Sequence, residues 1–234
     1  MPKSSQPGES DPPPVPWADI VKFVRQLSHD IRNNLNAVEL QSAFLAELAT
    51  DDEMKSEVQH LRQMVSQVGS NLQHLTAGLS QSKPNAISYK ATDFVEDLQQ
   101  KLAKEMPEQA KKIAWEMKLA DGTVHLDPFL AQQALLELFK NAFQHGESAM
   151  QITAKAYIDK DCFVFELIEP KANFTGSTET WGREPLRSTS QGHYGLGLNR
   201  VRAISEAHGG EFRAKYDRSA STLTTTIMLP LEKS

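Results

Sequence analysis

Two sequence patterns predict an α+β chain, in which a hairpin of two long helices is followed by an α/β-sandwich domain. In the first, apolar residues recur at three- and four-residue steps from about residue 17 to 50 and again from 54 to 79. In the second, beginning near residue 86, short strands alternate with helical stretches. A chain of 234 residues with 39% hydrophobic content is long enough to bury a core in one or two domains.

The composition excludes several classes of protein. A formal charge of -5, with no long stripe of Lys and Arg, argues against nucleic acid as the main partner. No apolar run approaches the roughly 20 residues that a membrane span needs, and no signal peptide is visible, so we expect no membrane segment within this chain and a cytoplasmic location. The single Cys162 excludes an intrachain disulfide and a multi-cysteine metal site, and we interpret it as a packing residue.

The first helix carries a histidine outside its apolar seam. The seam is formed by Ile20, Val24, Leu27, Ile31, Val38, Leu45 and Leu48. His29 lies two residues past Leu27, so we expect it to point outward, where another protein can reach it. A neutral imidazole is a nucleophile near neutral pH, and Asp30 can hold its tautomer or take a proton. The alternative is an ordinary surface histidine.

The second helix has a cleaner seam with a strict alternation of four- and three-residue steps. Its members are Met54, Val58, Leu61, Val65, Val68, Leu72, Leu75 and Leu79. Two such helices form an antiparallel hairpin that one chain can only half bury. Two hairpins from two chains would complete a four-helix bundle, so we predict a homodimer. A coiled coil that serves only for dimerisation is the simpler alternative.

The predicted domain boundaries follow changes in composition. Residues 1–16 are rich in proline and are expected to form a disordered tail, 17–80 form the hairpin, 81–85 form the linker and 86–234 form the second domain. In that domain Thr92 is predicted to cap a helix, and two further helices are predicted from Pro128 to His145 and through Val201 to Ala207. Strands are predicted at 86–91, 113–119, 123–126, 150–157, 162–168, 211–216 and 222–229.

The predicted helix from Pro128 to His145 is largely apolar but carries a polar stripe. Asp127 is expected to cap its N-terminus. Glu137, Asn141 and His145 follow one another at four-residue steps, which places a carboxylate, an amide and an imidazole on one face. Burying such groups without partners costs about 1–3 kcal/mol each. A bound ion or nucleotide would supply partners; the alternative is that the stripe faces water.

A long polar segment and a glycine-rich turn precede the last predicted helix. The segment 174–194 is poor in apolar residues, which is typical of a functional lid or a disordered loop. It ends in Gly192-His193-Tyr194-Gly195-Leu196-Gly197-Leu198. Glycines before a helix N-terminus let backbone amides approach a phosphate group.

Three of these stretches together resemble two-component sensor histidine kinases. His29-Asp30-Ile31-Arg32-Asn33 resembles their phosphoacceptor box. The stretch 137–146, ELFKNAFQHG, resembles the N box of histidine kinases and GHKL ATPases, and Gly195-Leu196-Gly197-Leu198 resembles their second glycine box. The resemblance covers roughly residues 17 to 230, with the boxes in the family's order.

The resemblance implies a fold, an activity and site residues. The second domain would be an ATP-binding domain of the Bergerat type, with Mg²⁺ bound by Asn141 and bridging the ATP phosphates. The chain would autophosphorylate His29, with Asp30 as acid-base partner, and pass the phosphate to an aspartate on the receiver domain of a response regulator. Asn33 would orient water for the reverse phosphatase activity. The remaining ATP-binding residues would be Glu137 near the metal or its water, Lys140 or His145 near phosphate, and Gly195, Leu196 and Gly197 in the glycine box.

The chain also departs from the family pattern. Asn34 stands where many members have proline, and His193 where many have another glycine. The segment 169–173, EPKAN, replaces the aspartate and glycines that hold adenine in the family. Glu169 can offer a carboxylate to the adenine amino group, with a longer reach. The missing aspartate and glycines favour an alternative function, a histidine phosphotransferase or pseudokinase relay that keeps the fold but binds ATP weakly or not at all.

Overall fold

The computed structural model describes residues 16–79, 83–119, 122–146, 151–183 and 195–232. The chain divides into two compact units, Met1–Ala77 and Gly78–Ser234. The predicted disordered tail lies, apart from Pro16, outside the described residues. Among the helices in these ranges, none has the length and apolar character that crossing a membrane requires.

The first unit is a hairpin of helices α1 (Trp17–Leu48) and α2 (Asp52–Gly78). The Asp51 carboxylate begins α2 by accepting a hydrogen bond from the backbone N–H of Met54 at 2.7 Å. Within this hairpin four of the seven predicted seam residues of α1 remain exposed, Leu27 at 45%, Val38 at 40%, Leu45 at 42% and Leu48 at 59%, whereas Ser28 and Ser42 are buried. The hairpin buries the side of α1 that carries these two serines, and the neighbouring side that carries Leu27 stays exposed.

The second unit is built on a five-stranded sheet with the strand order β2-β4-β5-β7-β6. Strand β2 runs parallel to β4, and the other neighbours are antiparallel. A separate two-stranded sheet pairs β1 with β3. The strands are β1 (Ile87–Lys90), β2 (Ile113–Lys118), β3 (Thr123–Leu126), β4 (Ile152–Asp159), β5 (Cys162–Pro170), β6 (Glu211–Asp217) and β7 (Thr222–Pro230).

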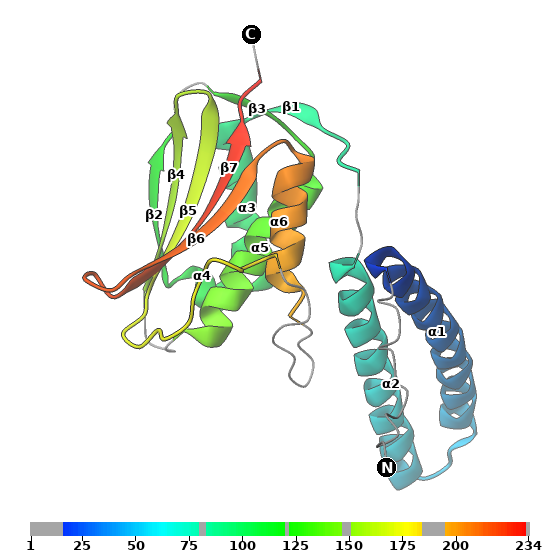
Figure 1. Ribbon diagram of the computed structural model, residues 1–234. Helices are drawn as coiled ribbons and strands as arrows, with labels where there is room; N and C mark the ends of the chain where they lie inside the picture. The colour runs from blue at the N-terminus through cyan, green and yellow to red at the C-terminus, as the bar shows by residue number, and fades with distance from the viewer. Residues whose placement is uncertain (1–15, 80–82, 120–121, 147–150, 184–194, 233–234) are drawn as a thin grey trace, which may run out of the picture. The chain divides into compact units, whose positions relative to one another are not determined.

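Helices α3 (Ala91–Glu105), α5 (Pro128–His145) and α6 (Gly197–Ala207) cover one face of this sheet, as Figure 1 shows. A short helix that the sequence did not predict, α4 (Pro107–Ala110), follows α3. The core lies between the helices and the sheet, where alternate residues of β5 point toward the helices. Its largest fully buried side chains include Phe94, Phe139, Phe163, Phe165 and Phe212.

The two predicted helix caps in this unit had different outcomes. Asp127 caps α5 as predicted, because its carboxylate accepts hydrogen bonds from the backbone N–H groups of Phe129 and Leu130, both at 3.0 Å. Burial raises the pKa of Asp127, but backbone hydrogen bonds from Leu130, Asn85 and Phe129 outweigh it and lower the pKa. The prediction for Thr92 was wrong: α3 begins at Ala91, whose N–H donates to the Gly122 carbonyl at 2.9 Å, so that no side-chain cap is needed.

His208 joins the end of α6 to the start of α5. The imidazole is buried, its Nδ1 donates to the Ile204 carbonyl at 2.7 Å, and its Nε2 accepts the Asp127 N–H at 2.9 Å. These two bonds fix the tautomer, because a ring nitrogen that accepts cannot carry the proton. The link holds α6 against α5, the two helices that carry the polar stripe and the glycine turn.

Replacing His208 with Ala should therefore lower the free energy of unfolding of the second unit by about 2–3 kcal/mol, because it leaves the Asp127 N–H buried without a partner. Urea denaturation of both proteins measures the difference. His125→Ala, at an exposed position of β3, is the matched control and should unfold as the unaltered protein does. Equal unfolding midpoints for His208→Ala and the control would contradict the proposed link.

Candidate functional site

The first cluster of functional side chains lies on one exposed stretch of α1. The His29 side chain is 64% exposed, as its predicted outward position requires. Its Nδ1 lies 3.3 Å from Oδ1 of Asp30 and 3.4 Å from Nδ2 of Asn33. Gln26, one turn earlier, donates from Nε2 to the same Asp30 oxygen at 2.9 Å. Four side chains from two adjacent turns therefore form one polar network.

This arrangement determines which imidazole nitrogen is available for chemistry. Within the described hairpin, the polar contacts of the His29 ring are made by Nδ1. An Nδ1–H that donates to Asp30 leaves the lone pair on Nε2. Nε2 is then a neutral nucleophile on an exposed helix surface.

The second cluster lies on α5 and the start of α6. Asn141 is partly buried, and its Nδ2 atom is buried without a hydrogen-bond partner among the described residues. One turn before it, the Glu137 carboxylate packs against Gly197 so closely that a Cβ at this glycine would collide with Oε1. Lys140 is exposed, and the side chain of His145, the last residue of α5, lies outside what the structure describes. The structure therefore brings Glu137 and Gly197 together.

An arginine that the sequence did not single out completes this cluster. Arg200 of α6 donates through Nη2 to Oε1 of Gln133, which lies one turn before Glu137 on α5. Burial lowers the pKa of the Arg200 guanidinium, and the negative charge of Glu137 opposes that shift. The four-residue step from Gln133 to Glu137 extends the polar stripe of α5, and it was the available sequence signal for this pair.

The glycine turn leads directly into α6. Gly195 has a φ of 62°, a left-handed conformation that a side chain would strain. Leu196 is the N-cap and its side chain is buried, and the helix begins at Gly197. The backbone N–H groups of the first turn have no partner within the helix, and of the residues that carry them only Gly197 lacks a side chain. Residues 192–194 of the predicted turn lie outside the described residues.

A third feature is the carboxyl group at the end of β5. Glu169 continues the face of Phe163, Phe165 and Leu167, so it points toward the helix layer and is only 8% exposed. Its Oε2 has no hydrogen-bond partner among the described residues, and Lys171 Nζ lies 3.9 Å away. Burial raises the pKa of Glu169, and the charge of Lys171 opposes the shift. The strand continues through Pro170, so Glu169 lies in a strand rather than in a loop.

The start of the predicted lid is held by aromatic and polar contacts. Phe174 packs edge-on against Trp181 and tilted against Tyr216, with ring centroids 5.8 and 5.0 Å apart. Arg202 of α6 donates to the Trp181 carbonyl at 3.1 Å. Residues up to Arg183 are thus attached to α6 and β6, whereas 184–194 lie outside the described residues.

The side chains on α5 and β5 fit a magnesium nucleotide in three respects. The amide of Asn141 and the carboxylate of Glu137 offer the oxygen ligands that Mg²⁺ prefers. Mg²⁺ keeps several waters and takes further ligands from phosphate oxygens, so one or two protein oxygens are sufficient. The unpartnered atoms of Asn141 and Glu169 can bond to a polar ligand.

One protein-family model matches part of the second unit. Residues 126–233 match the family model described as histidine kinase-, DNA gyrase B- and HSP90-like ATPase. No curated protein sequence matches the chain. The sequence match therefore rests on the second unit.

Solved structures extend the likeness to both units. Full-length ShkA in complex with AMPPNP is similar at a TM-score of 0.70 and 20% identity; the match covers 91% of this chain and 46% of that one. The histidine kinase AdeS of Acinetobacter baumannii is similar at a TM-score of 0.53 and 17% identity, and the match covers 88% of this chain and 98% of AdeS. The catalytic domain of histidine kinase ThkA, in a nucleotide-free form, is similar at a TM-score of 0.52 and 16% identity, and the match covers 62% of this chain and 95% of that domain.

At such low sequence identity, the structural similarity shows the fold alone. The chain spans about half the length of ShkA. The predicted resemblance and fold class are confirmed. Residues 126–233 match the histidine kinase-, DNA gyrase B- and HSP90-like ATPase family model, and together with the preceding helical hairpin the chain has the fold of a two-component sensor histidine kinase.

Proposed function

We propose that the chain is an ATP-dependent histidine kinase that phosphorylates itself on His29. The observation that carries this proposal is an exposed imidazole with Nδ1 next to Asp30, on a helix of a chain that also contains an ATPase domain. The AMPPNP complex of the similar ShkA supports ATP as the phosphoryl donor.

The proposed reaction forms a P–N bond at Nε2 of His29. The Nε2 lone pair attacks the γ-phosphorus while the bond to the bridging oxygen breaks, and that oxygen leaves with its electron pair on ADP. Asp30 holds the Nδ1 proton and compensates the positive charge that develops on the ring, or takes the proton. Transfers of this type depend mainly on positioning and charge neutralisation, so the approach of the ATPase unit to His29 should control the rate.

In this proposal the second unit holds ATP through its polar stripe and glycine turn. Asn141 and Glu137 would bind Mg²⁺, which when bound neutralises charge on the phosphates. The first-turn amides after Gly195 and Leu196, together with Lys140 and His145, would contact the phosphates. Glu169 would accept a hydrogen bond from the adenine amino group.

We also propose that the hairpin forms a homodimer. Large apolar side chains remain exposed on both helices: Phe23, Leu27, Val38, Leu40, Phe44, Leu45 and Leu48 on α1, and Met54, Leu61, Met64 and Val68 on α2. By helical spacing all of the α1 members except Leu40 and Phe44 share one face, and a second hairpin that packs against it completes a four-helix bundle. Sedimentation equilibrium should give twice the chain mass of 26.1 kDa; a monomer at micromolar concentration would refute the dimer.

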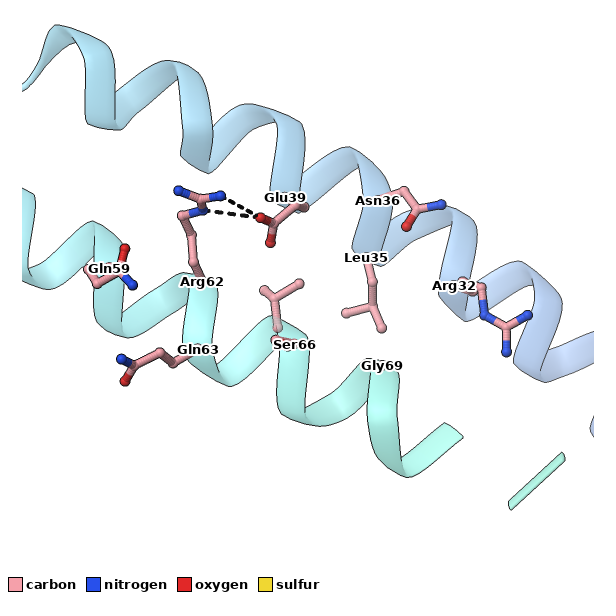
Figure 2. A pocket seen from close by; sticks show the side chains of 10 residues that line it. Arg32, Leu35, Asn36, Glu39, Gln59, Arg62, Gln63, Ser66 and Gly69 are labelled. Atoms are coloured by element: carbon pink, nitrogen blue, oxygen red, sulfur yellow. Dashed lines mark hydrogen bonds and ion pairs between the residues drawn. The ribbon is translucent and has the colours of Figure 1, made fainter. Parts of the chain in front are cut away.

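A groove of about 440 Å³ between α1 and α2 is the proposed docking surface for a receiver domain. It begins at Arg32, three residues after His29, and Arg62 reaches across it from α2 to the Glu39 carboxylate at 2.9 Å (Figure 2). By helical spacing it lies on the side of α1 opposite the exposed apolar face, so docking and dimerisation need not compete. The receiver's aspartate would take the phosphate, and Asn33 would orient water in the reverse reaction.

A second candidate function is a phosphotransferase or pseudokinase relay. Glu169, buried in strand β5 with Lys171 nearby, favours it, because a buried carboxyl there leaves less room for adenine. Calorimetric titration with ATP·Mg²⁺ discriminates between the two functions. Heat of binding at millimolar or lower concentration supports the kinase, and its absence supports the relay.

His29→Gln should abolish incorporation of ³²P from labelled ATP, because glutamine keeps a polar side chain without the nucleophilic nitrogen. The matched control is His60→Gln at an exposed position of α2, which should leave incorporation unchanged. Label retained on the His29 variant would refute this assignment.

Glu169→Gln should weaken ATP binding by roughly ten-fold, because a neutral acceptor replaces a charged one. Without nucleotide the same change should stabilise the protein at neutral pH by about 1 kcal/mol, since it removes a buried charge.

The direction of the change in stability follows from the raised pKa of Glu169. The folded state retains this proton to higher pH than the unfolded state, so stability falls as the pH rises through the raised pKa, and the variant should lack that fall. Calorimetric titration with ATP measures the change in affinity, and thermal unfolding at a series of pH values measures the change in stability. Glu105→Gln, at an exposed position, is the control for both. A variant with unchanged ATP affinity and unchanged pH dependence would contradict the role of Glu169.

Exchanging the groove ion pair, with Glu39→Arg combined with Arg62→Glu, should leave the hairpin stable but slow phosphotransfer about ten-fold or more. The side chains of Arg62 and Glu39 are 38% and 42% exposed, and ion pairs at such exposed positions contribute only about 0–1 kcal/mol to stability. The charges that a docking partner meets are nevertheless inverted.

The measurement is phosphotransfer from ³²P-labelled protein to each receiver domain encoded in the same genome. Exchange of the exposed pair Glu108 and Lys111 in the ATPase unit is the control. Unaltered transfer to every receiver would exclude the groove as the docking surface.

A further inference from the structure

Nδ1 of His29 has two neighbours with opposite hydrogen-bonding character. The Asp30 carboxylate, 3.3 Å away, only accepts hydrogen bonds. The Nδ2 group of Asn33, 3.4 Å away, only donates them. Asp30 therefore favours the tautomer with the proton on Nδ1, whereas the Asn33 amide nitrogen favours the tautomer with the proton on Nε2.

The choice between these tautomers controls the reactivity of Nε2. A proton on Nδ1 leaves Nε2 with a lone pair that can form a bond to phosphorus. A proton on Nε2 removes that lone pair, and a free histidine in water prefers this unreactive form. The helix surface must therefore bias His29 away from its ordinary preference.

Gln26 is placed to supply this bias. It lies one turn before Asp30 and donates from Nε2 to Asp30 Oδ1 at 2.9 Å, the same oxygen that faces His29. The Asp30 side chain is 58% exposed, so without this bond its carboxylate can rotate into water. The amide holds the carboxylate oxygen beside Nδ1, and it does so from within the same helix.

We propose that Gln26 is a positioning residue that holds Asp30 against Nδ1 of His29 and thereby selects the tautomer with a reactive Nε2. The inference rests on the proposed phosphorylation of His29, but the tautomer can be measured without ATP. Gln26 itself touches neither phosphate nor the reacting nitrogen.

The test uses the full chain and two variants. Gln26→Leu removes the donor, and Gln26→Glu replaces it with a carboxylate that repels Asp30. The matched control is Gln67→Leu on α2, since Gln67 makes the same four-residue amide contact, to Asn71 at 3.1 Å, away from His29. ¹⁵N chemical shifts of the imidazole nitrogens report the tautomer, and the His29 signals are assigned by their loss in His29→Gln.

The ratio of the Nδ1–H to the Nε2–H form should fall about two-fold in Gln26→Leu, the size expected for one such helix-surface bond, and further in Gln26→Glu. The control should keep the ratio of the unaltered protein. An unchanged ratio in both Gln26 variants would overturn the proposal.

A second readout separates this proposal from the kinase proposal. Phosphoramidate, a small phosphoryl donor that needs no nucleotide site, should phosphorylate His29 about two-fold more slowly in Gln26→Leu than in the control, as mapped on the His29 peptide. If ATP labels neither protein while the tautomer ratio still shifts, the kinase proposal fails and the role of Gln26 stands. Equal phosphoramidate rates together with equal tautomer ratios would overturn the role of Gln26 alone.

Discussion

Two polar atoms in the second unit, Nδ2 of Asn141 and Oε2 of Glu169, are buried without hydrogen-bond partners among the described residues. Each such atom costs a folded protein about 1–3 kcal/mol, which is a substantial share of the stability of a domain. The rest of the helix layer packs phenylalanine and leucine side chains against the sheet without comparable defects. A ligand that bonds to these atoms would turn the cost into binding energy, and the proposed nucleotide site depends on this constraint.

The two units divide the proposed chemistry between them. In the proposal the hairpin carries the nucleophile, His29, and the side chains that contact it or hold its neighbour Asp30 all lie within about two turns of α1. The ATPase unit carries the polar stripe, the glycine turn and the link through His208 that keeps α5 and α6 together. If both proposals hold, the tautomer of His29 is set within the hairpin and the supply of phosphate within the second unit.

The sequence predicted features that depend on local pattern. The Asp127 cap, the helix that follows it, and the outward position of His29 each follow from residues within one or two turns. Both predicted long helices appear in the structure because their apolar periodicity extends over many turns.

Features that depend on contacts distant in sequence were not predictable. Thr92 fails as a cap because the helix begins at Ala91, whose N–H donates to the Gly122 carbonyl thirty-one positions away in the sequence. The burial of Ser28 and Ser42 in place of Leu27 depends on how α2 packs on α1. Arg200 could not be assigned because its partner Gln133 lies on another helix. The four-residue step from Gln26 to Asp30 was visible in the sequence, but its meaning required the side-chain geometry.

The central claim is that ATP supplies a phosphoryl group to His29, and peptide mapping tests it most directly. The protein is incubated with ATP and Mg²⁺, digested under alkaline conditions that preserve phosphohistidine, and its peptides are identified by mass spectrometry. The account predicts one phosphoryl group on the peptide that contains His29 and none on the other histidine peptides. Bound ATP with an unmodified His29 peptide, or phosphate on a different residue, would contradict it.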